Sequence, residues 1–102
     1  MSRFSLTPAA KADIAEILDV IAADDPSAAR RVLAKIKAAM KRLARTPGLG
    51  HLREDLADEP LRFWPVYSYL IIYRVGMRPL QIIRVLHGAR DVSRVLRRRS
   101  GP

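Results

Sequence analysis

The stretch from Leu61 to Asp91 constrains the fold of this chain more than any other segment. It holds most of the residues that favour β-strands and nearly all the aromatic side chains, and arginines recur along it. Within it, Tyr67–Val75 alternates between two largely apolar faces, which is typical of a central strand covered on both sides. Leu80–His87 has a similar length and follows a turn at 76–79. The two segments therefore predict an antiparallel hairpin.

Shorter segments complete the predicted sheet. Leu61–Val66 is expected to be a third strand of the meander, with Pro65 at an edge, a bulge or the strand end, because proline cannot donate to a ladder. Near the start of the chain, residues 3–6 alternate and predict one more short strand. Beyond Gly88, Asp91 is expected to cap a short helix.

Two segments before the sheet carry helix signals. Thr7 and Pro8 form an N-cap followed by proline at the first helical position, and Asp25 and Pro26 repeat this arrangement. Because the connection between the two predicted helices is so short, they are expected to form an antiparallel hairpin. Apolar residues recur at three-four spacing in both helices, namely Ile14, Ile17, Leu18 and Ile21 in the first and Val32, Leu33, Ile36, Met40 and Leu43 in the second.

The predicted fold class is α+β, in the order β-α-α-β-β-β with a short C-terminal helix. A small antiparallel sheet is expected to pack against the helical hairpin. The length of 102 residues suits a single domain over 1–102. The predicted parts are a first strand in 1–7, the hairpin in 8–45, a loop in 46–60, the meander in 61–88, and a helix with a basic tail in 89–102.

Charge is the strongest compositional signal. Nineteen Lys and Arg against ten Asp and Glu give a formal net charge of +9, which favours an acidic partner, either a polyanion or an acidic protein surface. The absence of cysteine excludes disulfides and thiolate metal sites. With neither a leader pattern nor an apolar run of membrane-spanning length in view, a cytoplasmic protein is expected.

The second helix carries seven basic residues between Arg30 and Arg45 and no acidic one. We interpret this as a solvated face whose repulsion is relieved by Asp13, Glu16 and Asp19 of the neighbouring helix, because the helix lacks aromatic residues for base stacking. Docking of an acidic partner on the same face stays open.

Four motifs give the chain a family resemblance: LTPAAKADI at the first helix, RTPGLGHLRED after the hairpin, RFWPVYSYLIIYRV in the sheet and IIRVLHGARDV at its end. Together they resemble toxins of the ParE/RelE superfamily, which belong to bacterial type II toxin–antitoxin modules of the plasmid-stabilisation type. The resemblance implies a small sheet crossed by a helical hairpin, and growth arrest as the outcome of activity. RelE-like members cleave messenger RNA on the ribosome, whereas ParE-like members bind and poison DNA gyrase.

The positions that match the RelE pattern favour the ParE-like branch. Leu61 and Phe63 stand where lysines are expected, Leu70 stands where an arginine is expected, and Leu96 lies near the place of a terminal tyrosine. Arg90 alone survives, and no lysine follows Lys41. Because arginine keeps its charge, it stabilises phosphate but is a poor proton shuttle. The resemblance therefore implies a gyrase inhibitor rather than an enzyme.

No catalytic residue is assigned with this reading. His87 is of the side-chain type whose unperturbed pKa lies near neutrality, and it would act together with Arg90 only if the chain were a ribonuclease. No cofactor and no metal site are expected, since His51 has no obvious partner. A ribosome-dependent endoribonuclease and a non-toxic basic nucleic-acid-binding domain stay open as alternatives.

Two binding surfaces are predicted. The target would contact a surface lined by Arg62, Arg74, Arg84, His87 and Arg90, with an exposed arginine tail at 94–99 accelerating encounters. A ParD-like antitoxin with apolar anchors and acidic residues would bind along the two helices and the adjoining sheet edge. The residues predicted for antitoxin binding are Ile14, Ile17, Leu18, Ile21, Val32, Lys35, Ile36 and Arg42.

Overall fold

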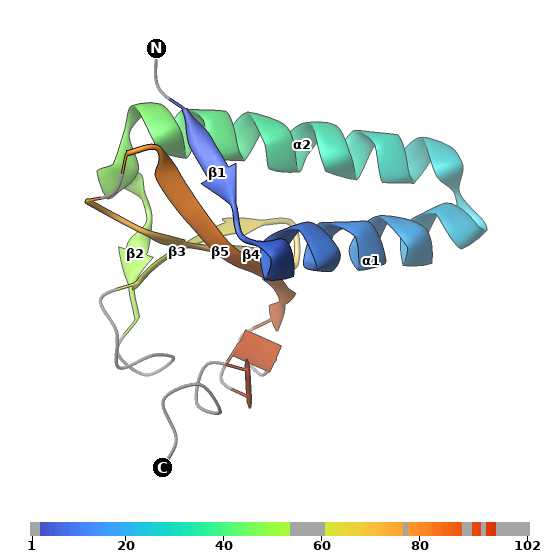
Figure 1. The fold of residues 1–102 in the computed structure, drawn as a ribbon. Coiled ribbons are helices and arrows are strands. Elements are labelled where there is room, and N and C mark those ends of the chain that lie inside the picture. Colours follow the sequence, from blue (N-terminus) through green and yellow to red (C-terminus); the bar gives the residue numbers. More distant parts are fainter. Residues whose placement is uncertain (1–2, 54–60, 77, 89–90, 93, 96–102) are drawn as a thin grey trace.

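The computed structural model describes residues 3–53, 61–76, 78–88, 91, 92, 94 and 95. Its elements, in chain order, are β1 (Phe4–Leu6), α1 (Pro8–Asp24), α2 (Pro26–Arg45), the 3-10 turn η1 (Pro47–Leu49), β2 (His51–Leu52), β3 (Leu61–Val66), β4 (Tyr69–Arg74) and β5 (Leu80–His87). The helical hairpin lies across one side of the sheet, and its closed end extends past the strands (Figure 1). The predicted α+β fold is confirmed.

The two helices begin where their capping signals predict. The Thr7 side chain accepts a hydrogen bond from the Ala10 N–H at 3.0 Å, and the Asp25 carboxylate accepts one from the Ala28 N–H at 3.1 Å. Each cap is followed by a proline at the first helical position, where no N–H is needed. These local signals make the helix starts readable from the sequence.

The sheet is mixed rather than antiparallel, with strand order β1-β5-β4-β3-β2. β1 pairs in parallel with the first part of β5, so that Phe4 lies opposite Leu80 and Leu6 opposite Ile82. The prediction of an antiparallel sheet was wrong for this strand, because the chain crosses over through the whole helical hairpin and the meander before it returns beside β1.

The structure has one strand that was not predicted, and the central strand begins later than predicted. His51–Leu52 forms a two-residue strand on β3 inside the predicted loop, too short to show any periodicity. The central strand begins at Tyr69 rather than Tyr67, because Tyr67 has a φ of 55° and belongs to the turn between β3 and β4. Among the described residues, no strand pairs with Pro65 on the outer side of β3, since β2 pairs with Arg62 and Phe63.

Both faces of the sheet are covered, as the sequence of the central strand predicts. On the hairpin side, Ile36, Met40 and Leu43 of α2 join the core with Ile71 and Tyr73 of β4. The opposite face has its own cluster of buried residues, namely Leu61, Phe63, Ile72, Ile83, Leu86 and Val92. Of the described residues beyond β5, Asp91, Val92, Arg94 and Val95 have helical backbone, whereas Gly88 has a positive φ of 79°.

Tyr73 fastens the connection after α2 to the core. Its buried hydroxyl donates to the Pro47 carbonyl at 2.6 Å and accepts from the Gly50 N–H at 2.7 Å. Arg62 adds a hydrogen bond to the Gly50 carbonyl at 2.7 Å. Burial of the phenol raises the pKa of Tyr73, and the Gly50 hydrogen bond and the charge of Arg62 oppose this rise. These contacts hold the segment between α2 and β2 in place, and β2 then pairs at the edge of the sheet.

None of the helices in the described part of the chain is both long and apolar enough to cross a membrane.

Candidate functional site

Asp13 of α1 continues the edge of β5 where β1 ends. One carboxylate oxygen accepts from Arg84 Nε at 2.7 Å and from the Val85 N–H at 3.0 Å, and the other accepts from Arg84 Nη2 at 2.8 Å. The pair is largely shielded, with 24% of the Arg84 side chain and 11% of the Asp13 side chain exposed. These hydrogen bonds raise the pKa of Arg84, and partial burial opposes them. The ion pair fixes the position of α1 over the sheet.

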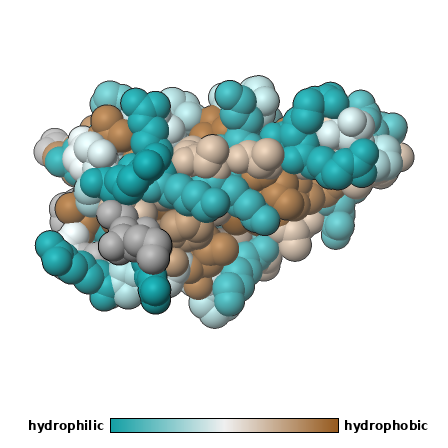
Figure 2. All heavy atoms as spheres, turned by 90° about the horizontal axis from the view of Figure 1, so that it is seen from above, coloured by the Kyte–Doolittle hydropathy of each residue, from teal (hydrophilic) through white to brown (hydrophobic). Residues whose placement is uncertain are grey.

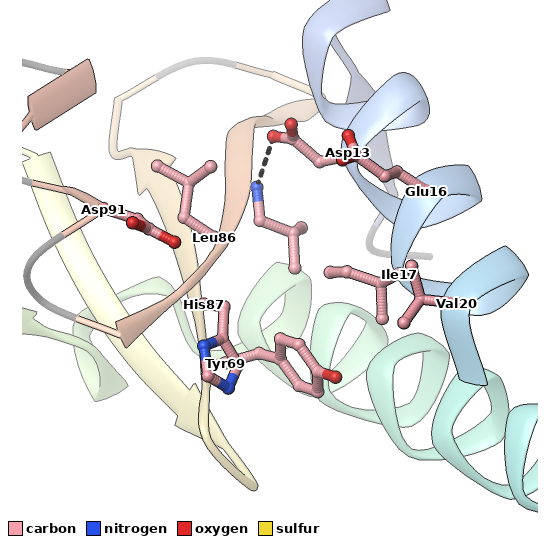
Figure 3. Close-up of a pocket in the computed structure, with 9 residues that line it drawn as sticks. Asp13, Glu16, Ile17, Val20, Tyr69, Leu86, His87 and Asp91 are labelled. Carbon is pink, nitrogen blue, oxygen red and sulfur yellow. Dashed lines mark hydrogen bonds between the residues drawn. The ribbon is translucent and has the colours of Figure 1, made fainter.

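A cavity of about 370 Å³ opens beside this ion pair, and we call it the α1 groove. Ile17 and Val20 project into it from α1, facing Tyr69 and His87 from the strands (Figure 3). Val20 is 68% exposed, so most of this apolar side chain is accessible to solvent. The remaining lining residues are Asp13, Glu16, Val85, Leu86 and Asp91.

His87 is held at the rim of the α1 groove. Its Nε2 lies 3.1 Å from the Ser68 hydroxyl, and its ring meets Tyr69 edge-on with centroids 5.1 Å apart. Neither neighbour is a charged group, so these contacts position the imidazole without supplying an acid–base partner.

A second cavity, of about 340 Å³, lies between α2 and the end of β3, and we call it the α2 groove. Trp64 forms part of its wall, with the Arg42 guanidinium 5.7 Å from its ring centroid and the His51 ring stacked on it at 6.4 Å. Tyr67 is 62% exposed at its outer end. The remaining lining residues are Lys35, Ala38, Ala39, Pro65 and Val66.

The residues predicted for antitoxin binding divide into two groups. Ile14 and Ile36 are buried in the core on the hairpin side, so they pack the helices onto the sheet and are not accessible to a partner. The other six have accessible surface: Ile17 lines the α1 groove, Lys35 and Arg42 line the α2 groove, and Leu18, Ile21 and Val32 are half-buried on the hairpin.

The residues predicted for target binding do not share one surface. Arg62 stands between Leu61 and Phe63 of the opposite-face cluster and so lies on the hairpin side of the sheet. Arg74 follows Tyr73 of the hairpin-side core and so lies on the opposite face. Arg84 is joined to Asp13, and His87 lines the α1 groove. Arg90 and the arginines at 97–99 lie outside the described residues.

Several lining residues were not predicted from the sequence. The acidic residues Asp13 and Glu16 were expected to relieve repulsion from the second helix, yet Asp13 pairs with Arg84 of β5 and both line the α1 groove. Trp64 and Tyr67 were assigned to the sheet alone. A lone tryptophan followed by proline near the end of a strand is a signal that could have indicated an aromatic surface.

The fold and the two grooves define a small α+β protein with a cavity beside each helix of a helical hairpin. A family model described as the ParE toxin of the type II toxin–antitoxin system, parDE, matches residues 4–92. The chain therefore belongs to the ParE toxin family, as its sequence resemblance predicted.

A solved structure supports the fold assignment. The chain described as the chromosomal ParDE toxin–antitoxin system from P. aeruginosa is 23% identical, with a TM-score of 0.71. The match covers 86% of the present chain and 97% of that chain. At this identity the likeness establishes the fold. A search of curated proteins gave no match.

Proposed function

We propose that this ParE-family toxin arrests growth by binding DNA gyrase, without catalysing a reaction itself, in the cytoplasm where gyrase works. The observation that carries the proposal is the family match over residues 4–92, which is nearly the whole chain. The ParE-like branch of the superfamily is the branch that acts on gyrase.

The contacts of the candidate groups support binding rather than catalysis. Cleavage of RNA by its own 2′-hydroxyl needs groups that move protons at the reacting oxygens. Arg62 donates to backbone carbonyls and Arg84 to a carboxylate, and both side chains keep a fixed charge near neutral pH. The His87 ring lies against the Ser68 hydroxyl and the Tyr69 ring, and neither of these groups is a charged partner for proton transfer.

A supercoiling assay tests the gyrase proposal. Purified toxin, freed of antitoxin, is expected to inhibit supercoiling of relaxed plasmid by gyrase in a dose-dependent manner. Translation on programmed ribosomes serves as the parallel measurement and is expected to stay intact. Cleavage of messenger RNA in that reaction, together with unaffected gyrase, would instead establish the ribonuclease alternative.

A ParD-like antitoxin is the proposed neutralising partner. The α2 groove supports this, because it combines Lys35 and Arg42 with the exposed aromatic Tyr67 and with Trp64. A segment with carboxylates and apolar anchors would satisfy both kinds of lining. The antitoxin encoded in a neighbouring reading frame is expected to bind the toxin and to restore gyrase activity in the same assay.

A further inference from the structure

The α1 groove and the α2 groove meet at one pair of residues on the hairpin side of the sheet. Val66 lines the α2 groove, Tyr69 lines the α1 groove, and the two residues are direct partners at the end of the β3–β4 ladder. Both also pack against the core under the hairpin. One partner segment that crosses this end of the sheet would therefore contact both grooves in turn.

The charged side chains among the described lining residues differ in sign between the two grooves. Lys35 and Arg42 line the α2 groove, whereas Glu16 and Asp91 line the α1 groove, where the charge of Asp13 is already matched by Arg84. An acidic groove is unexpected on a protein of net charge +9. The overall charge of the protein does not account for the carboxylates of the α1 groove. Their local field favours a cationic group of the partner in this groove.

Apolar surface lies between the two charged ends. Val20 and Tyr67 are the two large apolar side chains of the grooves that are most exposed, at 68% and 62%. Ile17 and Tyr69 are half-buried beside them. Seen from above, the molecule also shows hydrophobic patches interspersed with hydrophilic side chains (Figure 2). Covering such side chains with apolar anchors would remove them from water.

We propose that a single segment of the antitoxin occupies both grooves in a fixed direction. A lysine or arginine of the segment pairs with Glu16 and Asp91 in the α1 groove, apolar residues cover Val20 and Tyr67, and carboxylates pair with Lys35 and Arg42 in the α2 groove. The identity of the partner rests on the proposed function, whereas the order of charges rests on the two grooves alone. An entirely acidic segment would be repelled at the α1 end.

Charge reversal with matched controls tests the two ends. Glu16→Lys and Lys35→Glu are each expected to weaken binding of the antitoxin at least tenfold in isothermal titration calorimetry. The controls Asp19→Lys and Lys37→Glu make the same charge changes at exposed positions of the same helices, outside both grooves, and are expected to change the Kd less than about threefold. Equal effects of a variant and its control would overturn the assignment of that groove.

Cross-linking tests the direction of the segment. Because the chain has no cysteine, Glu16→Cys and Lys35→Cys each provide one thiol, which is paired with single cysteines placed along the antitoxin segment. Glu16→Cys is expected to cross-link beside a lysine or arginine, and Lys35→Cys beside acidic residues at a separate position of the same molecule. Cross-links at coinciding positions, or to two different antitoxin molecules, would overturn the proposal. Absence of any binding by the unmodified toxin would contradict the proposed partner itself.

Discussion

The carboxylate of Asp13 and the guanidinium of Arg84 join the first helix to the last strand through two hydrogen bonds of 2.7 and 2.8 Å. The same carboxylate accepts the Val85 N–H, so one side chain completes both an ion pair and a strand edge. The α1 groove lies directly beside this contact, and its shape depends on the position of α1.

Removal of either partner of this pair is expected to destabilise the protein. Arg84→Ala leaves a mostly shielded carboxylate with one remaining donor, and we expect a loss of about 1–3 kcal/mol in the free energy of unfolding. Asp13→Ala is expected to cost at least as much, because the Val85 N–H also loses its acceptor. Urea denaturation measures both, with Asp19→Ala on the exposed face of α1 as the control. A double-mutant cycle without coupling between Asp13 and Arg84 would contradict this account.

Tyr73→Phe is expected to destabilise the connection between α2 and β2. The substitution removes a donor to the Pro47 carbonyl and an acceptor for the Gly50 N–H in a buried site, and we expect a cost of about 1–3 kcal/mol. Thermal unfolding followed by circular dichroism measures it. An unchanged melting temperature would show that the hydroxyl does not hold the connection.

Gly50→Ala and Gly48→Ala form a matched pair in the same connection. A Cβ at Gly50 would lie 2.3 Å from the Tyr73 hydroxyl oxygen, whereas a Cβ at Gly48 would meet nothing within 4 Å. Gly50→Ala is therefore expected to cost about 1–3 kcal/mol through overpacking, and Gly48→Ala less than about 0.5 kcal/mol. Equal stability of the two variants in urea would contradict the observed packing of Tyr73.

Alkaline pH is expected to weaken the fold through Tyr73. Because burial raises its pKa above the ordinary value of 10.0, the neutral phenol is favoured in the folded state. Its contribution is fully present below pH 10 and is lost as the pH rises through the folded-state pKa. The free energy of unfolding should therefore fall more steeply above pH 10 in the wild type than in Tyr73→Phe. Parallel profiles of the two proteins would exclude this linkage.

Trp64 provides an optical signal for occupation of the α2 groove. It is the only tryptophan of the chain, and it lies against Arg42 in the wall of that groove. Antitoxin binding is expected to change its emission, and Lys35→Glu should shift the titration midpoint at least tenfold. The Trp64→Phe variant serves as the control, because any emission change that remains on binding comes from tryptophan residues of the antitoxin. An emission that stays constant at saturating antitoxin would place the bound segment away from the α2 groove.

Local signals made much of the fold predictable. Thr7–Pro8 and Asp25–Pro26 mark helix starts, because each capping side chain accepts a hydrogen bond from the backbone N–H three residues later. The alternation of Leu80–His87 marks a covered strand. The parallel pairing of β1 was missed because a strand of three residues does not encode its neighbour. The turn at Tyr67 was missed because its positive φ occurs at an aromatic residue rather than glycine.

The grooves were less accessible to prediction than the elements that form them. Asp13 and Arg84 are 71 residues apart, and their contact follows only from the placement of α1 against β5. Arginines at strand positions suggested one shared surface, but Arg62 and Arg74 fall on opposite faces once the register is known. Side-chain type was readable from the sequence, whereas the neighbours of each side chain depended on tertiary packing.

Accumulation of gyrase-cleaved DNA tests the central claim most directly. Antitoxin-free toxin is incubated with gyrase, ATP and supercoiled plasmid, the reaction is stopped with detergent and protease, and linear DNA is quantified. We expect linear DNA to increase with toxin concentration and to return to the background level when the antitoxin is added first. A constant background of linear DNA across the toxin titration, with full supercoiling activity, would contradict the assignment of gyrase as the target.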